Sequence, residues 1–104
     1  MVAAGAAALG RQVVLFATND GCRALMADWA SLVDSARDAA VRARGVAGLA
    51  ELAEAATELG VRRIACEAGL RMIDATAAAL AAGVEVAGIA TFLEAVGSGQ
   101  IVTL

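Results

Sequence analysis

The chain has 104 residues, a formal net charge of −3, and neither histidine nor lysine. This length fits one α/β domain, so we expect a single domain over residues 1–104. The absence of histidine excludes hydrolases of the Ser-His-Asp and Cys-His types. The eight basic residues are all arginines and form no basic tract, so we expect no binding to nucleic acid.

The sequence also lacks the common signatures of metal and nucleotide sites. Two cysteines without histidine do not form a zinc site, so we expect no metal. The glycines of Gly83–Gly88 do not have the GxGxxG spacing of a dinucleotide fingerprint, and the sequence contains no P-loop. We therefore expect no cofactor.

Hydrophobic residues make up 61% of the chain, which raises the question of a membrane segment. Residues 75–93 carry one charged side chain, Glu85, but they are mostly alanine and glycine, and Gly83 and Gly88 interrupt them, so we expect no transmembrane span. The N-terminus has no basic region or cleavage signature, so we expect no signal peptide and a cytoplasmic location. A domain this small has too little interior for so many apolar residues, so we expect a homo-oligomer.

Four helices and strands are predicted before Gly60. Alanine runs favour helices, β-branched and aromatic residues favour strands, and glycine favours helix ends. In chain order we expect a helix over 3–9, a buried strand over 12–17, a turn over 18–21, a helix whose apolar face carries Leu25, Met26, Trp29, Leu32, Val33 and Ala36, and an amphipathic helix over 49–59. Met26 and Trp29 are interpreted as residues of the core or of a subunit interface.

Five more elements are predicted after Gly60. In chain order they are a strand over 61–65 that leads to Cys66, a helix with apolar positions from Leu70 to Ala81, a strand over 84–89, a short helix that a capping box at Thr91–Glu94 opens and Gly97 ends, and a strand over 101–104. Strands that alternate with helices indicate a parallel sheet covered on both faces. We therefore expect a small three-layer α/β/α fold with about four strands.

Cys66 is the residue most suggestive of chemistry. It follows a strand and precedes a helix, where unpaired backbone N–H groups and the helix dipole favour the thiolate, the form that attacks sulfur. Open parallel sheets bind their ligands at this carboxyl edge. Arg71 would support the thiolate, whereas Glu67 would oppose it. The alternative is that Cys66 is an inert buried side chain, which is a common state of a free cysteine.

Cys22 is a candidate second thiol. It follows the first predicted strand, so it lies at the same edge of the sheet as Cys66 and could form a disulfide with it after oxidation. The alternative is an ordinary residue in the first turn of a helix. Beside it, Asp20 is interpreted as the N-cap of that helix, and Arg23 either steers an anionic sulfur donor or is simply solvated.

Several segments together resemble the DsrE/DsrF-like sulfur-relay family, in the branch often labelled peroxiredoxin-like. The resemblance rests on Val13–Thr18, Gly21–Leu25, Gly60–Cys66 with Met72, and Gly83–Leu93. It implies a three-layer α/β/α fold, assembly into oligomers, a persulfide on Cys66 and transfer of its sulfur to a partner such as a TusA-like carrier. The chain departs from the family after Cys66, where relatives usually have Met and Ser. The leading helix has no strand before it, so the first strand of the family has no counterpart here.

Three functional hypotheses follow. The first is a sulfur-relay protein, a sulfurtransferase-type carrier that accepts sulfane sulfur as a persulfide on Cys66 and passes it to a partner thiol. The second is a non-catalytic oligomeric interaction subunit with an inert Cys66. The third is a thiol redox protein that uses Cys22 with Cys66.

Overall fold

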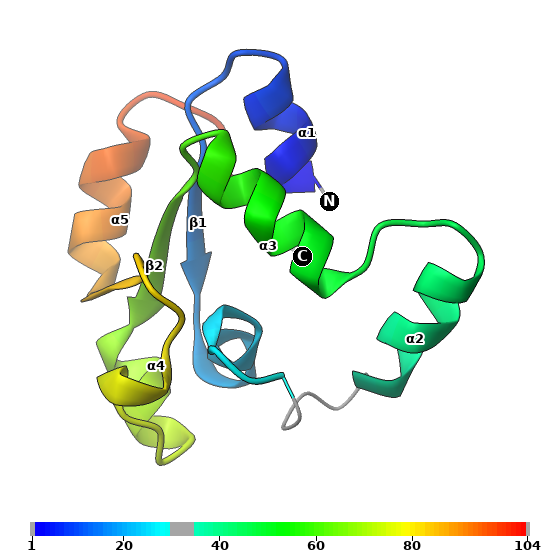
Figure 1. The fold of residues 1–104 in the computed structure, drawn as a ribbon. Coiled ribbons are helices and arrows are strands. Elements are labelled where there is room, and N and C mark those ends of the chain that lie inside the picture. The colour runs from blue at the N-terminus through cyan, green and yellow to red at the C-terminus, as the bar shows by residue number, and fades with distance from the viewer. Residues whose placement is uncertain (1, 30–34, 104) are drawn as a thin grey trace.

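A parallel sheet of three strands forms the centre of the molecule (Figure 1). The computed structural model describes residues 2–29 and 35–103. The strands lie in the order β1 (Val14–Ala17), β2 (Arg62–Cys66) and β3 (Glu85–Ala87), and both neighbouring pairs are parallel. In this register Ala17 lies opposite Ala65, and Cys66 lies opposite Ala87. The predicted α/β class with a parallel sheet is confirmed.

The helices of the described residues are α1 (Val2–Ala8), the 3-10 helix η1 (Asn19–Leu25), α2 (Ser35–Ala43), α3 (Leu49–Glu58), α4 (Glu67–Met72), the short 3-10 helix η2 (Ala77–Ala79) and α5 (Ile89–Val96). Helix α2 projects away from the sheet (Figure 1). Helices α1 and α3 pack against each other on one side, and α5 lies on the other (Figure 1). This arrangement agrees with the predicted three layers. Among the described residues, no helix is long and apolar enough to cross a membrane.

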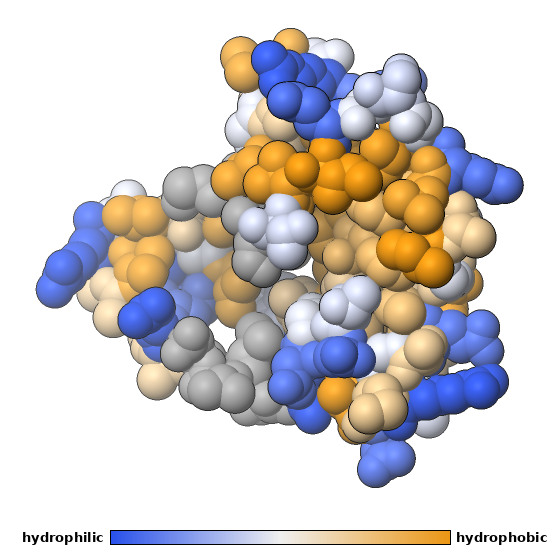
Figure 2. Space-filling model, turned by 180° about the vertical axis from the view of Figure 1, so that it is seen from behind, coloured by the Kyte–Doolittle hydropathy of each residue, from blue (hydrophilic) through white to orange (hydrophobic). Residues whose placement is uncertain are grey.

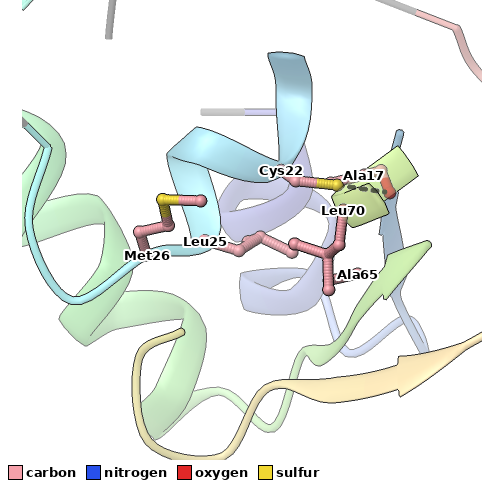
Figure 3. Packing of buried hydrophobic residues seen from close by; sticks show 6 residues of the cluster. All are labelled: Ala17, Cys22, Leu25, Met26, Ala65 and Leu70. Atoms are coloured by element: carbon pink, nitrogen blue, oxygen red, sulfur yellow. Dashed lines mark hydrogen bonds between the residues drawn. The ribbon is translucent and has the colours of Figure 1, made fainter. Parts of the chain in front are cut away.

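The alternation of side chains along β1 explains how the two faces are filled. Successive side chains of a strand point to opposite faces of the sheet. Leu15 and Ala17 pack against the cluster that η1 and α4 complete, while the ring of Phe16 stacks on that of Phe92 from α5, with the ring centroids 4.8 Å apart. Figure 3 shows six residues of the cluster, which are Ala17, Cys22, Leu25, Met26, Ala65 and Leu70.

Two predictions about the C-terminal half are wrong. Residues 101–103 form no strand, so the sheet has three strands where about four were expected, and Leu104 lies outside the described residues. The helix expected over 70–81 is also much shorter than predicted. Helix α4 ends at Met72, and the positive φ of 53° at Asp74 turns the chain out of the helix. Apolar spacing predicted burial correctly here, since Leu70, Ile73 and Leu80 all contact the core, but it did not reveal the turn between them.

Two further helices begin elsewhere than predicted. The apolar spacing from Leu25 to Ala36 indicated one helix, but Met26 has an extended backbone and forms an antiparallel bridge with Leu80, and α2 begins at Ser35. Residues 30–34 of that prediction lie outside the described residues. Helix α5 begins at Ile89 with Gly88 as its N-cap, so the capping box predicted at Thr91–Glu94 is not formed. Only Gly88 separates the end of β3 from the start of α5.

Candidate thiol site

Cys66 is the last residue of the central strand and the N-cap of α4. Because β2 lies between β1 and β3, this position is at the middle of the carboxyl edge of the sheet, where open α/β folds place their ligands. The residue is half-buried, and its thiol is free. Cys66 is therefore not part of the fully buried core.

Cys22, in contrast, is fully buried at 0% exposure. It lies in η1, and its thiol Sγ donates a hydrogen bond to the Ala17 carbonyl at 3.3 Å (Figure 3). Burial raises the pKa of the Cys22 thiol because the charged form loses its hydration, and the backbone N–H of Cys66 lowers that pKa by a smaller amount. Cys22 is thus a protonated thiol that solvent does not reach.

The structure brings these two cysteines together. The Ala17 carbonyl that Cys22 binds belongs to the residue opposite Ala65, directly before Cys66. Cys22 and Ala65 belong to the same buried cluster, and η1 contacts both β2 and α4, so Cys22 lies near the strand end that carries Cys66. Both thiols are free. The placement of Cys22 at the edge that carries Cys66 agrees with the order of the strands and helices in the sequence.

Gly69 allows η1 and α4 to approach each other. A Cβ atom at Gly69 would lie 2.4 Å from the backbone nitrogen of Asn19 and 3.2 Å from backbone atoms of Thr18. Asn19 itself has a φ of 48°, in the left-handed region that asparagine tolerates better than most residues. The sharp turn after β1 and the missing side chain at Gly69 together place η1 against the start of α4. Sequence reasoning did not identify this role of Gly69, because the helix was predicted to begin only at Leu70, whereas α4 begins at Glu67.

The charged residues near the two thiols pair with one another. Asp20 accepts a hydrogen bond from the Arg23 Nε at 3.2 Å, and Arg71 Nη2 donates to Glu67 Oε1 at 2.9 Å. The interpretation of Asp20 as an N-cap is wrong, because η1 begins one residue earlier, at Asn19, after Thr18. The Glu67 and Arg71 side chains are mostly exposed and pair with each other across one turn of α4.

The other residues singled out in the sequence lie away from this edge or form ordinary contacts. Met26 is buried in the core cluster, whereas Trp29 is half-buried and its indole Nε1 donates to the Ala24 carbonyl at 3.0 Å. Over residues 2–29 and 35–103, no three side chains of the types His, Cys, Asp and Glu are grouped so that they could hold a metal ion.

The part of the chain that carries Cys66 matches a known family. A family model described as DsrE/DsrF/DrsH-like matches residues 29–104. The chain belongs to this family. Membership of the DsrE/DsrF/DrsH-like family indicates a sulfur-relay role in general terms, and the matched residues include β2, Cys66 and everything after them. Strand β1 and Cys22 precede the matched region, and no curated protein matches the chain.

Proposed function

We propose that this protein accepts sulfane sulfur as a persulfide on Cys66 and passes it to the thiol of a partner protein. The observation that supports this most directly is a free, half-buried cysteine at the carboxyl edge of the central strand, within the region that matches a sulfur-relay family. Cys22 cannot perform the same step with an external donor, because it is fully buried.

Each half of the reaction is an exchange between sulfur atoms. The Cys66 thiolate attacks the outer sulfur of a donor persulfide, the donor S–S bond breaks, and the donor leaves as a thiolate. A partner thiolate then attacks the outer sulfur of the Cys66 persulfide, and Cys66 is released as a thiolate. Neither step needs an external oxidant, a metal or a base, provided that the attacking thiol is ionised. By resemblance, the partner is a TusA-like sulfur carrier.

Intact mass spectrometry tests this proposal. The full chain is incubated with inorganic polysulfide, freed of excess reagent and weighed at once. We expect the Cys22→Ala variant to gain the mass of a sulfur atom, to lose it on treatment with a thiol reductant, and to transfer it to an added TusA-like carrier. The matched Cys66→Ala variant, which retains the buried thiol, should gain nothing. Uptake by Cys66→Ala, or no uptake by Cys22→Ala, would contradict the proposal.

A homo-oligomeric interaction surface is a second candidate, and one observation favours it. Ile89 and Leu93 lie one turn apart on α5 and are 56% and 50% exposed, and Val86 of β3, the strand that precedes α5, is also exposed. Figure 2 shows hydrophobic residues gathered on the back of the molecule, toward the side where α5 lies. Exposed apolar side chains that cluster in this way are typical of surfaces that bind another protein.

Sedimentation analysis of charge-introducing variants tests this surface. Leu93→Glu places a carboxylate on the exposed side of α5 and should shift an oligomer toward the monomer. Val46→Glu, at an exposed apolar residue in the segment between α2 and α3, is the matched control and should leave the mass unchanged. A monomeric wild-type protein would contradict self-association. Persulfide uptake by the Leu93→Glu monomer would show that the two candidate functions are separable.

A further inference from the structure

One buried nucleophile has no role in the relay described above. Cys22 is fully buried, yet it lies beside the only other thiol of the chain. We propose that Cys22 is a resolving thiol that discharges the Cys66 persulfide intramolecularly, releasing hydrosulfide and leaving a Cys22–Cys66 disulfide. This inference rests on the proposed function, since it needs a persulfide on Cys66. It adds a persulfide-reducing activity to the carrier.

The first argument is position. Helix η1 packs against β1, β2 and α4, which are the elements that surround Cys66. The Cys22 sulfur is 3.3 Å from the carbonyl of Ala17, whose partner across the sheet, Ala65, is in the same core cluster. Because Ala65 directly precedes Cys66, the Cys22 sulfur lies next to the end of β2, and rotation about the Cα–Cβ bond of Cys66 can turn the Cys66 sulfur toward it.

The second argument is the difference in exposure between the two thiols. Cys66 is half-exposed and can be loaded from outside, whereas Cys22 meets only what Cys66 carries. A persulfide placed on Cys66 therefore has two nucleophiles available to it, a partner thiol from solvent and Cys22 from the protein interior. The sulfur is relayed when a partner is bound and is discharged as hydrosulfide when none arrives.

The chemistry balances without an external oxidant. The terminal sulfur of the persulfide carries the negative charge at neutral pH, and the Cys22 thiol is protonated. The Cys22 proton moves to that terminal sulfur, the Cys22 thiolate attacks the inner sulfur of Cys66, the persulfide S–S bond breaks, and hydrosulfide leaves with the proton. The two cysteine sulfurs are oxidised to a disulfide, and the sulfane sulfur is reduced. A dithiol reductant then supplies two electrons and two protons to restore both thiols.

Two features of the site keep this step slower than transfer to a partner. The Cys22 thiol must leave its hydrogen bond to the Ala17 carbonyl before it can attack. Its desolvated surroundings also disfavour the thiolate that performs the attack. The loaded carrier consequently persists long enough to meet a partner.

The test compares the fate of the persulfide in three full-length proteins. Wild type, Cys22→Ala and Cys22→Ser are loaded with inorganic polysulfide, desalted, and followed by intact mass, released sulfide and peptide mapping after alkylation. Cys22→Ser keeps the size of the side chain and a donor for the Ala17 carbonyl, and circular dichroism verifies that both variants are folded. We expect wild type to lose the added sulfur, release an equal amount of sulfide and yield a Cys22–Cys66 linked peptide. Both variants should hold the persulfide at least about tenfold longer.

The outcomes separate this inference from the proposed function. If all three proteins take up sulfur on Cys66 but lose it at the same rate, the relay function stands and the resolving role of Cys22 is refuted. That role is also refuted if wild type loses its sulfur without forming the linked peptide, a result that needs no variant. If none of the three takes up sulfur, the proposed function itself fails.

Discussion

Replacing Gly69 with alanine tests how closely η1 and α4 must approach. The added Cβ atom would lie 2.4 Å from the Asn19 backbone nitrogen, where ordinary contact begins near 3.4 Å, so the two segments must separate by about 1 Å. The atom that the new Cβ would meet belongs to the backbone, so no change of side-chain rotamer relieves the clash. Overpacking of this kind costs about 1–3 kcal/mol, and the better helix propensity of alanine offsets about 1 kcal/mol. Because a clash with backbone belongs at the upper end of that range, at about 2–3 kcal/mol, we expect a net loss of about 1–2 kcal/mol in the free energy of unfolding.

Urea unfolding measured by circular dichroism gives this value, and Gly21→Ala provides the control. Gly21 lies in η1, has no positive φ and has open space around its missing Cβ, so alanine there should stabilise the protein by about 0.4–1 kcal/mol. A displacement of about 1 Å between reacting groups can slow a reaction by about a hundredfold. Gly69→Ala should therefore form the Cys22–Cys66 disulfide much more slowly than wild type, with uptake of sulfur on Cys66 retained. A Gly69→Ala protein as stable as wild type would refute this account of the packing.

Three further predictions concern pH, surface charge and the core. Burial raises the pKa of the Cys22 thiol above the ordinary value of 9.0, so above that pH the folded state holds a proton that the unfolded state has lost. The free energy of unfolding should therefore fall as the pH rises beyond 9.0, by at most about 1.4 kcal/mol per pH unit. The chain has no lysine, tyrosine or histidine, so few side chains other than the cysteines titrate in this pH range. In urea unfolding measured across it, Cys22→Ala should therefore remove much of the dependence of stability on pH. Arg71→Gln leaves Glu67 unpaired next to Cys66 and should slow the uptake of anionic polysulfide about twofold. Glu67→Gln should accelerate this uptake by a similar factor, and the double variant should resemble wild type. Equal uptake rates in all four proteins would contradict the electrostatic role of the pair. Ile64→Ala removes a fully buried side chain from the central strand and should lower the free energy of unfolding by about 2–5 kcal/mol. Val86→Ala, on the exposed edge strand, should change it by less than about 1 kcal/mol. Similar urea midpoints for the two variants would argue against this assignment of the core.

Sequence patterns predicted the type and order of most elements because those patterns reflect burial and backbone preference directly. The apolar stripe of residues 49–59 became α3 (Leu49–Glu58), and the β-branched run around Val14 became β1. The alternation of strands and helices required a parallel sheet. From that alone, Cys66 and Cys22 were expected at one edge, since the carboxyl ends of parallel strands meet there.

The tertiary structure alone decided where helices end and which thiol is accessible. Local propensity favours a helix in the alanine-rich segment 75–82, and the contacts of Leu70, Ile73 and Leu80 with the core overrode that preference and selected the turn at Asp74. The burial of Cys22 depends on a long-range approach between η1 and α4 that only Gly69 permits. The amino-acid sequence determined that two thiols would share an edge of the sheet. Their unequal exposure follows from backbone packing between segments far apart in the chain, which local patterns do not encode.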